Sequence, residues 1–285
     1  MTHRAYGYAR LSAQRSGLLK TDDIAAMRCA SDEGSASRVA RSLGIETEAK
    51  RFERLLGRYR AIFNCYADAR PVVRALLGLH EIENVKLGWS AVARAIDVER
   101  WTPLWHDLHE LASVSRVSFV RAHTLYDVVG ALATTPFAAI ATDVYMAHAS
   151  DLGSAELALD RWAGQQVVME SGELAKSEAL ARQIAEGIVH LRDIEIDRRG
   201  TSAYGLSAEA IAAARVLPQK RKWPDLNVLC RRAFRGQTRS LAPAVAYAAL
   251  AERDYRIARA VAERGGDSLL DAAADLVIGW SNRST

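Results

Sequence analysis

An amphipathic helical pattern that occurs three times limits the folds open to this sequence. In the first copy, apolar residues recur at helical spacing from Val72 to Trp89, and Glu81 and Asn84 fall roughly opposite that stripe. The pattern predicts a helix over residues 76–89 that has a buried side and an acidic side.

Two later segments repeat this design, at residues 184–198 and at residues 244–262. Every copy contains two acids separated by one residue, with a basic residue soon afterwards. The acid pairs are Glu81 and Glu83, Asp193 and Glu195, and Glu252 and Asp254. The copies are roughly 60–110 residues apart, which is longer than the period of short helical solenoids, so each is expected to lie in its own small bundle. Because acidic pairs are common on amphipathic helices, coincidence is the alternative interpretation.

The rest of the sequence is typical of an all-α protein. Ala, Leu and Arg dominate, there are only 6 prolines, and alternating strand-like runs are scarce. Besides the three copies, helices are predicted over residues 6–19, 37–43, 47–66, 106–111, 123–132, 137–149, 155–169, 226–234 and 268–280. The second copy belongs to a longer predicted helix over residues 173–199.

Composition and charge exclude several classes of protein. A chain of 285 residues with 49% hydrophobic residues is not intrinsically disordered and can build two or three modest cores. The net charge of +4 is too small to indicate nucleic acid by itself. No stretch approaches the ~20 apolar residues of a membrane span, and the first residues lack the apolar core of a signal peptide. Cys29, Cys65 and Cys230 are far apart, as expected of reduced structural thiols.

Two groups of residues are candidate metal sites. His106 and His109 are three residues apart on a predicted helix, but no H-E-x-x-H motif accompanies them, so a surface pair is the favoured interpretation. Asp193, Glu195 and Asp197 form an acidic cluster of the kind that metal-dependent all-α enzymes use. Successive acids two residues apart point about 200° from each other on a helix, so they cannot converge on one ion without partners. No serine elbow, phosphate loop or reactive cysteine signature is present.

A strongly basic segment extends from Arg215 to Arg239, where Asp225 is the single acid. It contains few aromatic residues and no nucleic-acid motif, which favours an acidic protein or membrane surface as its partner over nucleic acid. The residues assigned to this basic surface are Lys220, Arg221, Lys222, Arg231, Arg232 and Arg235.

Four motifs together resemble one known family, and they extend over nearly the whole chain. They begin with the opening segment Tyr6–Leu19 and the segment LHEIENVK at residues 79–86. The others are LATTPF at residues 132–137 and AYAALAERDYRIAR at residues 246–259. In this order and spacing the sequence resembles the rotor-connecting subunit of rotary V/A-type ATPases, called C in archaeal-type enzymes and d in vacuolar ones.

The resemblance implies a pseudo-threefold funnel of three similar small helical domains, placed here at residues 1–110, 111–205 and 206–285. Such a funnel stands on the membrane ring of proteolipid subunits and receives the foot of the central shaft. It couples the two for proton or sodium transport without an active site, cofactor, small-molecule substrate or nucleic acid. The resemblance places the chain as a peripheral protein at the cytoplasmic face of the membrane. By resemblance, the funnel lining and shaft contacts involve Glu81, Glu83, Asn84, Asp193, Glu195, Glu252 and Asp254.

Two alternatives stay open at this stage. One is a stand-alone all-α scaffold or adaptor that has the same fold without the ATPase. The other is a metal-dependent all-α enzyme that uses Asp193, Glu195 and Asp197.

Overall fold

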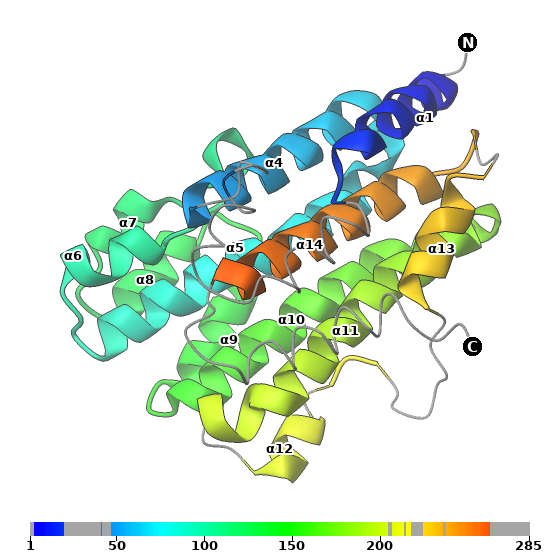
Figure 1. Cartoon of the computed structure of the whole chain (residues 1–285). Helices are drawn as coiled ribbons and strands as arrows, with labels where there is room; N and C mark the ends of the chain where they lie inside the picture. Colours follow the sequence, from blue (N-terminus) through cyan, green and yellow to red (C-terminus); the bar gives the residue numbers. More distant parts are fainter. Residues whose placement is uncertain are drawn as a thin grey trace. The chain divides into compact units, whose positions relative to one another are not determined.

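The computed structural model describes residues 3–19, 41, 47–204, 207–213, 215–217, 225–235 and 238–262. All regular elements within these ranges are helices (Figure 1), which confirms the all-α prediction. The predicted helix over residues 268–280 and the thiol of Cys29 lie outside these ranges, as does the predicted helix over residues 37–43 apart from residue 41.

The described helices form two compact units, each built from segments that are not contiguous in sequence. Unit 1 takes residues 1–73, 171–188 and 222–285, and unit 2 takes residues 74–170 and 189–221. The division of the chain into three domains and their arrangement as a funnel stay predictions.

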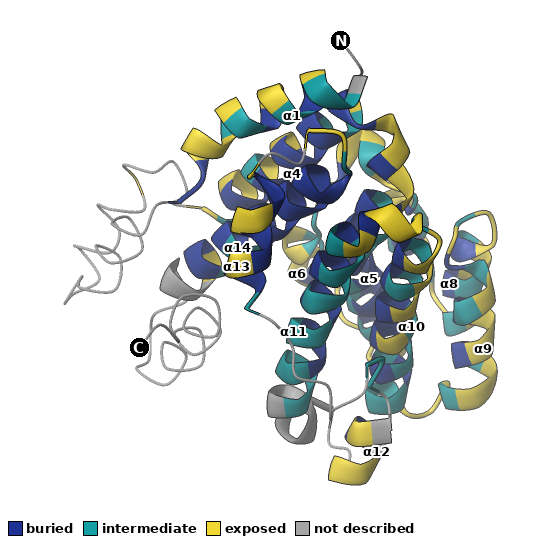
Figure 2. Ribbon diagram, turned by 90° about the vertical axis from the view of Figure 1, so that its right-hand side faces the viewer, coloured by how far each residue is buried: buried dark blue, intermediate teal, exposed yellow. Residues whose placement is uncertain are grey.

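Unit 1 is built around a long helix that is buried on nearly all sides. The helices of this unit are α1 (His3–Gln14), α4 (Glu48–Cys65), α13 (Leu226–Ala233) and α14 (Ala242–Ala262). α4 and α13 pack against α14, and α1 packs against both α4 and α14 (Figure 1). Figure 2 shows α14 buried along most of its length. Residues 242–251 of α14 are apolar and buried on all sides, as expected of a core helix, and the many alanines of α14 allow its neighbours to approach closely.

The predicted apolar stripe of this helix is confirmed. Ala244, Ala248, Ala251, Tyr255 and Ala258 are all buried. Where α4 faces this stripe, the ring of Phe52 meets that of Tyr255 edge to face, with centroids 5.9 Å apart.

Three long helices contribute to unit 2. They are α5 (Arg70–Ala93), α10 (Leu152–Gly172) and α11 (Ala179–Tyr204), of which residues 74–93, 152–170 and 189–204 belong to this unit. The predicted stripe of α5 is confirmed, since Leu76, Leu79, Ile82, Val85 and Trp89 are buried. The short helices of this unit are α6 (Val98–Trp101), α7 (Arg116–Val120), α8 (Leu125–Leu132), α9 (Ala138–His148) and α12 (Ala208–Ala213).

Local sequence explains several helix ends. Thr124 and Asp127 form a capping box at the start of α8, and the Thr47 side chain accepts from the Lys50 N–H at the start of α4. The next helix was predicted to begin at residue 155, but α10 begins at Leu152, and the carboxylate of Asp151 accepts from the Ser154 N–H at 3.1 Å. The helix therefore begins three residues earlier than predicted.

The helix predicted over residues 106–111 is wrong. Residues 106–108 have no regular structure, and only a single 3-10 turn, His109–Leu111, follows them. The reason is a long-range contact. The Asn84 amide donates to the His106 carbonyl at 2.7 Å and accepts from the His106 N–H at 2.8 Å, which holds this backbone in place in the manner of a strand partner.

Candidate functional site

The three acid-bearing helices are α5, α11 and α14, and four of the six acids in their acid pairs are buried. Glu81, Asp193, Glu252 and Asp254 are 2%, 6%, 5% and 4% exposed. The side of α5 that carries Glu81 is therefore a second buried side. A buried carboxylate is costly unless it finds partners, so its partners define its role.

Glu81 on α5 holds a distant loop through the loop's backbone. Its Oε1 accepts from the N–H of Val114 at 2.9 Å and from the N–H of Ser113, and its Oε2 accepts from Arg74 at 3.0 Å. Burial raises the pKa of this carboxyl, and the Arg74 charge and the two loop N–H groups oppose that rise. The carboxylate closes the loop that leads into α7.

Asp193 on α11 makes the same kind of contact. Its two oxygens accept from the N–H of Val216 at 3.4 Å and from the N–H of Leu217 at 3.1 Å. Burial raises its pKa, and the two N–H groups oppose the rise. Asp193 therefore corresponds to Glu81 in chemistry as well as in its place in the repeat.

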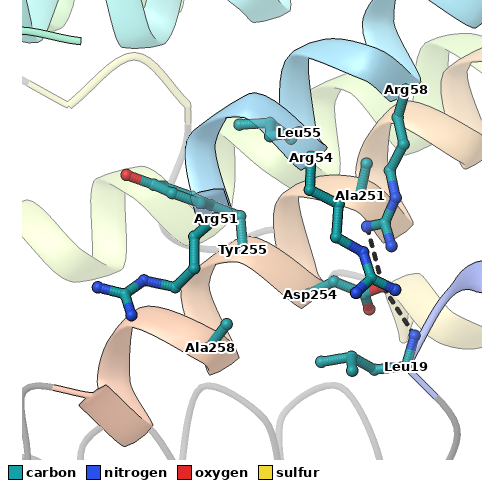
Figure 3. Close-up of a pocket in the computed structure, with 9 residues that line it drawn as sticks. All are labelled: Leu19, Arg51, Arg54, Leu55, Arg58, Ala251, Asp254, Tyr255 and Ala258. Atoms are coloured by element: carbon teal, nitrogen blue, oxygen red, sulfur yellow. Dashed lines mark hydrogen bonds and ion pairs between the residues drawn. The ribbon is translucent and has the colours of Figure 1, made fainter. Parts of the chain in front are cut away.

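The third copy, on α14, uses its second acid for this purpose. The Asp254 carboxylate accepts from the Leu19 N–H at 2.8 Å and pairs with the Arg58 guanidinium at 3.0 Å (Figure 3). Glu252, the first acid, accepts from the buried Tyr59 hydroxyl at 2.6 Å. Each copy thus places one buried carboxylate against the backbone N–H of a segment far away in sequence.

A fourth buried carboxylate of this kind lies in unit 1 outside the repeat. Glu178 accepts from the Leu241 N–H at 2.8 Å and the Ser240 hydroxyl at 2.6 Å, at the start of α14. Its other oxygen pairs with Arg4 of α1 at 3.1 Å. Glu178 was not predicted, because this residue belongs to no helical stripe.

Unit 2 contains a charge cluster that joins three helices. Asp160 of α10 lies between Lys86 of α5, whose ammonium is 2.9 Å away, and Arg192 of α11, with which it forms a short ion pair. Glu83 of α5 also pairs with both cations, at 2.9 Å from Lys86 and 2.6 Å from Arg192. We call these four residues the charge cluster.

The charge cluster is balanced, with two acids and two bases. The Asp160 side chain is 1% exposed, those of Arg192 and Lys86 are 10% and 11% exposed, and that of Glu83 is 40% exposed. Burial raises the pKa of Glu83, but the attraction of Lys86 and Arg192 outweighs burial and holds it below the ordinary value. Asp160 was not predicted, although an aspartate flanked by Leu157, Leu159 and Ala163 is a usable signal of a buried charge.

The acids proposed for a metal-dependent enzyme are engaged in internal contacts. Asp193 binds the loop described above, Asp197 pairs with Arg215, and Glu195 is half-buried. Within the described ranges, no group of three or more His, Cys, Asp or Glu side chains is placed to hold a metal ion. Cys65 and Cys230 are buried free thiols, and burial raises the pKa of Cys230 to about 12.

A pocket in unit 1 lies between α4 and α14, beside Asp254 (Figure 3). Arg51, Arg54 and Arg58 follow one another along α4 on its wall, and Tyr255 lies on the α14 side. Arg54 and Arg58 both donate to the Gly17 carbonyl, at 2.6 and 3.0 Å. These cations thus fix the segment after α1.

The predicted basic surface is described only in part. Arg231, Arg232 and Arg235 are exposed at the end of α13, whereas Lys220, Arg221 and Lys222 lie outside the described residues. α13 itself is capped by Asp225, whose carboxylate accepts from the N–H of Asn227 at 2.7 Å.

Comparison of the chain with models of known protein families finds no family that matches, and comparison with curated proteins finds no match. Among the described helices, none is long and apolar enough to cross a membrane.

Proposed function

We propose that the chain is a non-catalytic central-stalk subunit of a V/A-type rotary ATPase. It would connect the rotating central shaft to the proteolipid ring and so couple ATP turnover to proton or sodium transport. In this proposal the chain is peripheral, at the cytoplasmic face of the membrane, and has no cofactor or small-molecule substrate.

The observation that carries the proposal is the repeated carboxylate contact on α5, α11 and α14. The sequence repeat that matches the family pattern coincides with a repeated physical device, in which a helix carboxylate binds the backbone of a remote segment. Coincidental acidic pairs would not be expected to make the same contact three times. This agreement supports a chain built from three related helical parts.

The same contacts suit a part that transmits torque. Such a part must resist shear, and it needs no catalytic pocket. Buried charged contacts have strict geometry. If one partner of a buried ion pair is removed, the other charge stays buried without compensation, and the fold typically loses ~3–5 kcal/mol of stability. The charge cluster, which joins three helices, and the four loop-binding carboxylates would therefore stiffen each unit.

The metal-dependent enzyme is the weaker alternative. For Asp193 and Asp197 to bind an ion, the loop at residues 216–217 and Arg215 would have to give up their contacts with these acids. The stand-alone scaffold shares every structural feature named above, so only its partners distinguish it from the stalk subunit.

Affinity purification of the tagged chain from gently solubilised native membranes tests the proposal. We expect proteolipid ring and central-shaft subunits to be recovered with it in stoichiometric amounts, identified by mass, and to be absent from a tag-only control. Recovery of the chain alone from the soluble fraction would refute the stalk assignment and favour the scaffold.

A further inference from the structure

Arg231, one of the exposed arginines of α13, borders a groove in unit 1. The groove lies where the segment after α1 meets α13, and this junction is fixed by two contacts. The Tyr8 hydroxyl donates to the Phe234 carbonyl at 2.8 Å, and the Arg15 guanidinium lies 5.0 Å from the centre of the Phe234 ring.

The groove has an apolar lining and a cationic rim. Its apolar side chains are Leu18, Leu19, Cys230, Phe234 and Leu250. The Arg253 guanidinium also lines the groove, but it already donates to the Asp254 carboxylate at 2.8 Å and to the Leu19 carbonyl at 3.0 Å. The rim residues Arg15 and Arg231 therefore provide the cations that face outwards.

The surface around the groove has an excess of positive charge. Arg15 and Arg231 line the groove, and Arg232 and Arg235 follow closely in sequence. All four are exposed, and none of them forms an ion pair with an acid in the part of the chain that the structure describes. Val228, which is 57% exposed, lies one helical turn before Arg231 and Arg232 on α13. The surface thus combines an apolar groove, one exposed apolar side chain and four uncompensated arginines.

We propose that this groove binds an acidic amphipathic segment of a partner protein. An apolar side chain of that segment enters the groove, and its carboxylates meet the rim arginines, whose planar guanidinium groups suit bidentate pairing with carboxylates. The inference rests on the proposed function, because it specifies which kind of partner binds the basic surface of the proposed stalk subunit.

Two other kinds of partner fit the observations less well. A single-stranded nucleic acid needs open aromatic faces for stacking, and the ring of Phe234 already lies against Arg15. A lipid surface presents a plane of phosphates, whereas this site is concave and apolar inside.

A binding assay with a synthetic probe tests the inference. The probe is a fluorescein-labelled helical peptide with one stripe of Leu flanked by Glu, and its binding to the full chain is followed by anisotropy. We expect the R231E/R235E variant to bind about tenfold more weakly, because one attractive charge in the groove lining and one next to the lining residue Phe234 in sequence become repulsive. Binding to the unaltered chain should also weaken as salt is raised.

The R94E/R100E variant is the matched control. Arg94 and Arg100 are exposed in unit 2, outside the groove, so their reversal changes net charge equally and should leave peptide binding unchanged. Circular dichroism melting of both variants checks that they fold. The inference is overturned if the peptide fails to bind, if both variants weaken it alike, or if only phosphatidylserine vesicles bind. Because the peptide is synthetic, these outcomes are independent of whether the ring and shaft co-purify with the chain.

Discussion

Replacement of Asp160 by Asn should be among the most destabilising conservative substitutions in unit 2. Asn keeps the shape of the side chain but removes the fully buried negative charge of the cluster, so that Lys86 and Arg192 keep only the partly exposed carboxylate of Glu83. Lys86 and Arg192 are about nine-tenths buried, so water cannot compensate them fully. Removing one partner of a buried ion pair typically costs about 3–5 kcal/mol.

Urea unfolding followed by circular dichroism measures this cost. With a urea dependence of ~2–3 kcal/mol per M, the midpoint of the affected transition should fall by about 1–2 M. Raising the salt concentration should change this loss little, because buried charges are poorly screened.

Glu83→Gln is the matched control, since Glu83 pairs with the same two cations but its side chain is 40% exposed. Its replacement should cost at most about 1 kcal/mol, and that cost should shrink in high salt. If Asp160→Asn costs no more than Glu83→Gln, burial does not decide the energetics of the cluster and the reasoning is refuted.

Two further predictions concern packing and pH. Gly88→Ala should destabilise unit 2 by about 1–3 kcal/mol in the same urea assay, because the new methyl group would overlap the fully buried ring of Phe119. Gly130→Ala, with open space around it, should instead stabilise α8 by up to ~1 kcal/mol, and equal effects would contradict the packing argument. For the pH dependence, the free energy of unfolding of the unaltered chain is compared with that of the Asp193→Asn variant. Because folding raises the pKa of Asp193, the unaltered chain should lose stability relative to the variant as pH rises above the ordinary pKa of 3.8. Measured against Glu83→Gln, it should lose stability as pH falls below 4.5, because the folded-state pKa of Glu83 is lowered. Slopes of the same sign in the two comparisons would refute these assignments.

The helices were predictable because their information is local. The stripe through Leu79, Ile82 and Val85 and the alanine stripe of α14 give both the helix and its buried face at helical spacing. The prediction that Cys65 and Cys230 are structural thiols follows from their spacing, and both are buried and free.

The contacts of the acids were not predictable because they depend on distant segments. Nothing near Glu81 in sequence indicates that it binds the N–H groups of Ser113 and Val114. The same limitation explains the error over residues 106–111, where the preceding Pro103 suggests the start of a helix but the Asn84 amide binds the backbone of His106 instead. A charged residue on a helix is ordinarily solvated, so the repeat singled out these acids without showing that they are buried.

The repeat is also less regular in space than in sequence. Glu81 and Asp193 occupy the first acid position and bind loop N–H groups, whereas in α14 this task falls to Asp254 at the second position. Tyr59 explains the difference, because its buried hydroxyl already donates a hydrogen bond to the Glu252 carboxylate.

The central claim, that the chain couples shaft to ring, is tested most directly by ion transport in membranes from cells that lack it. The account predicts that ATP-driven ion uptake into vesicles from such cells is lost while ATP hydrolysis by the catalytic part continues. Adding back the purified chain should restore uptake. Uptake that is undiminished without the chain would contradict the account.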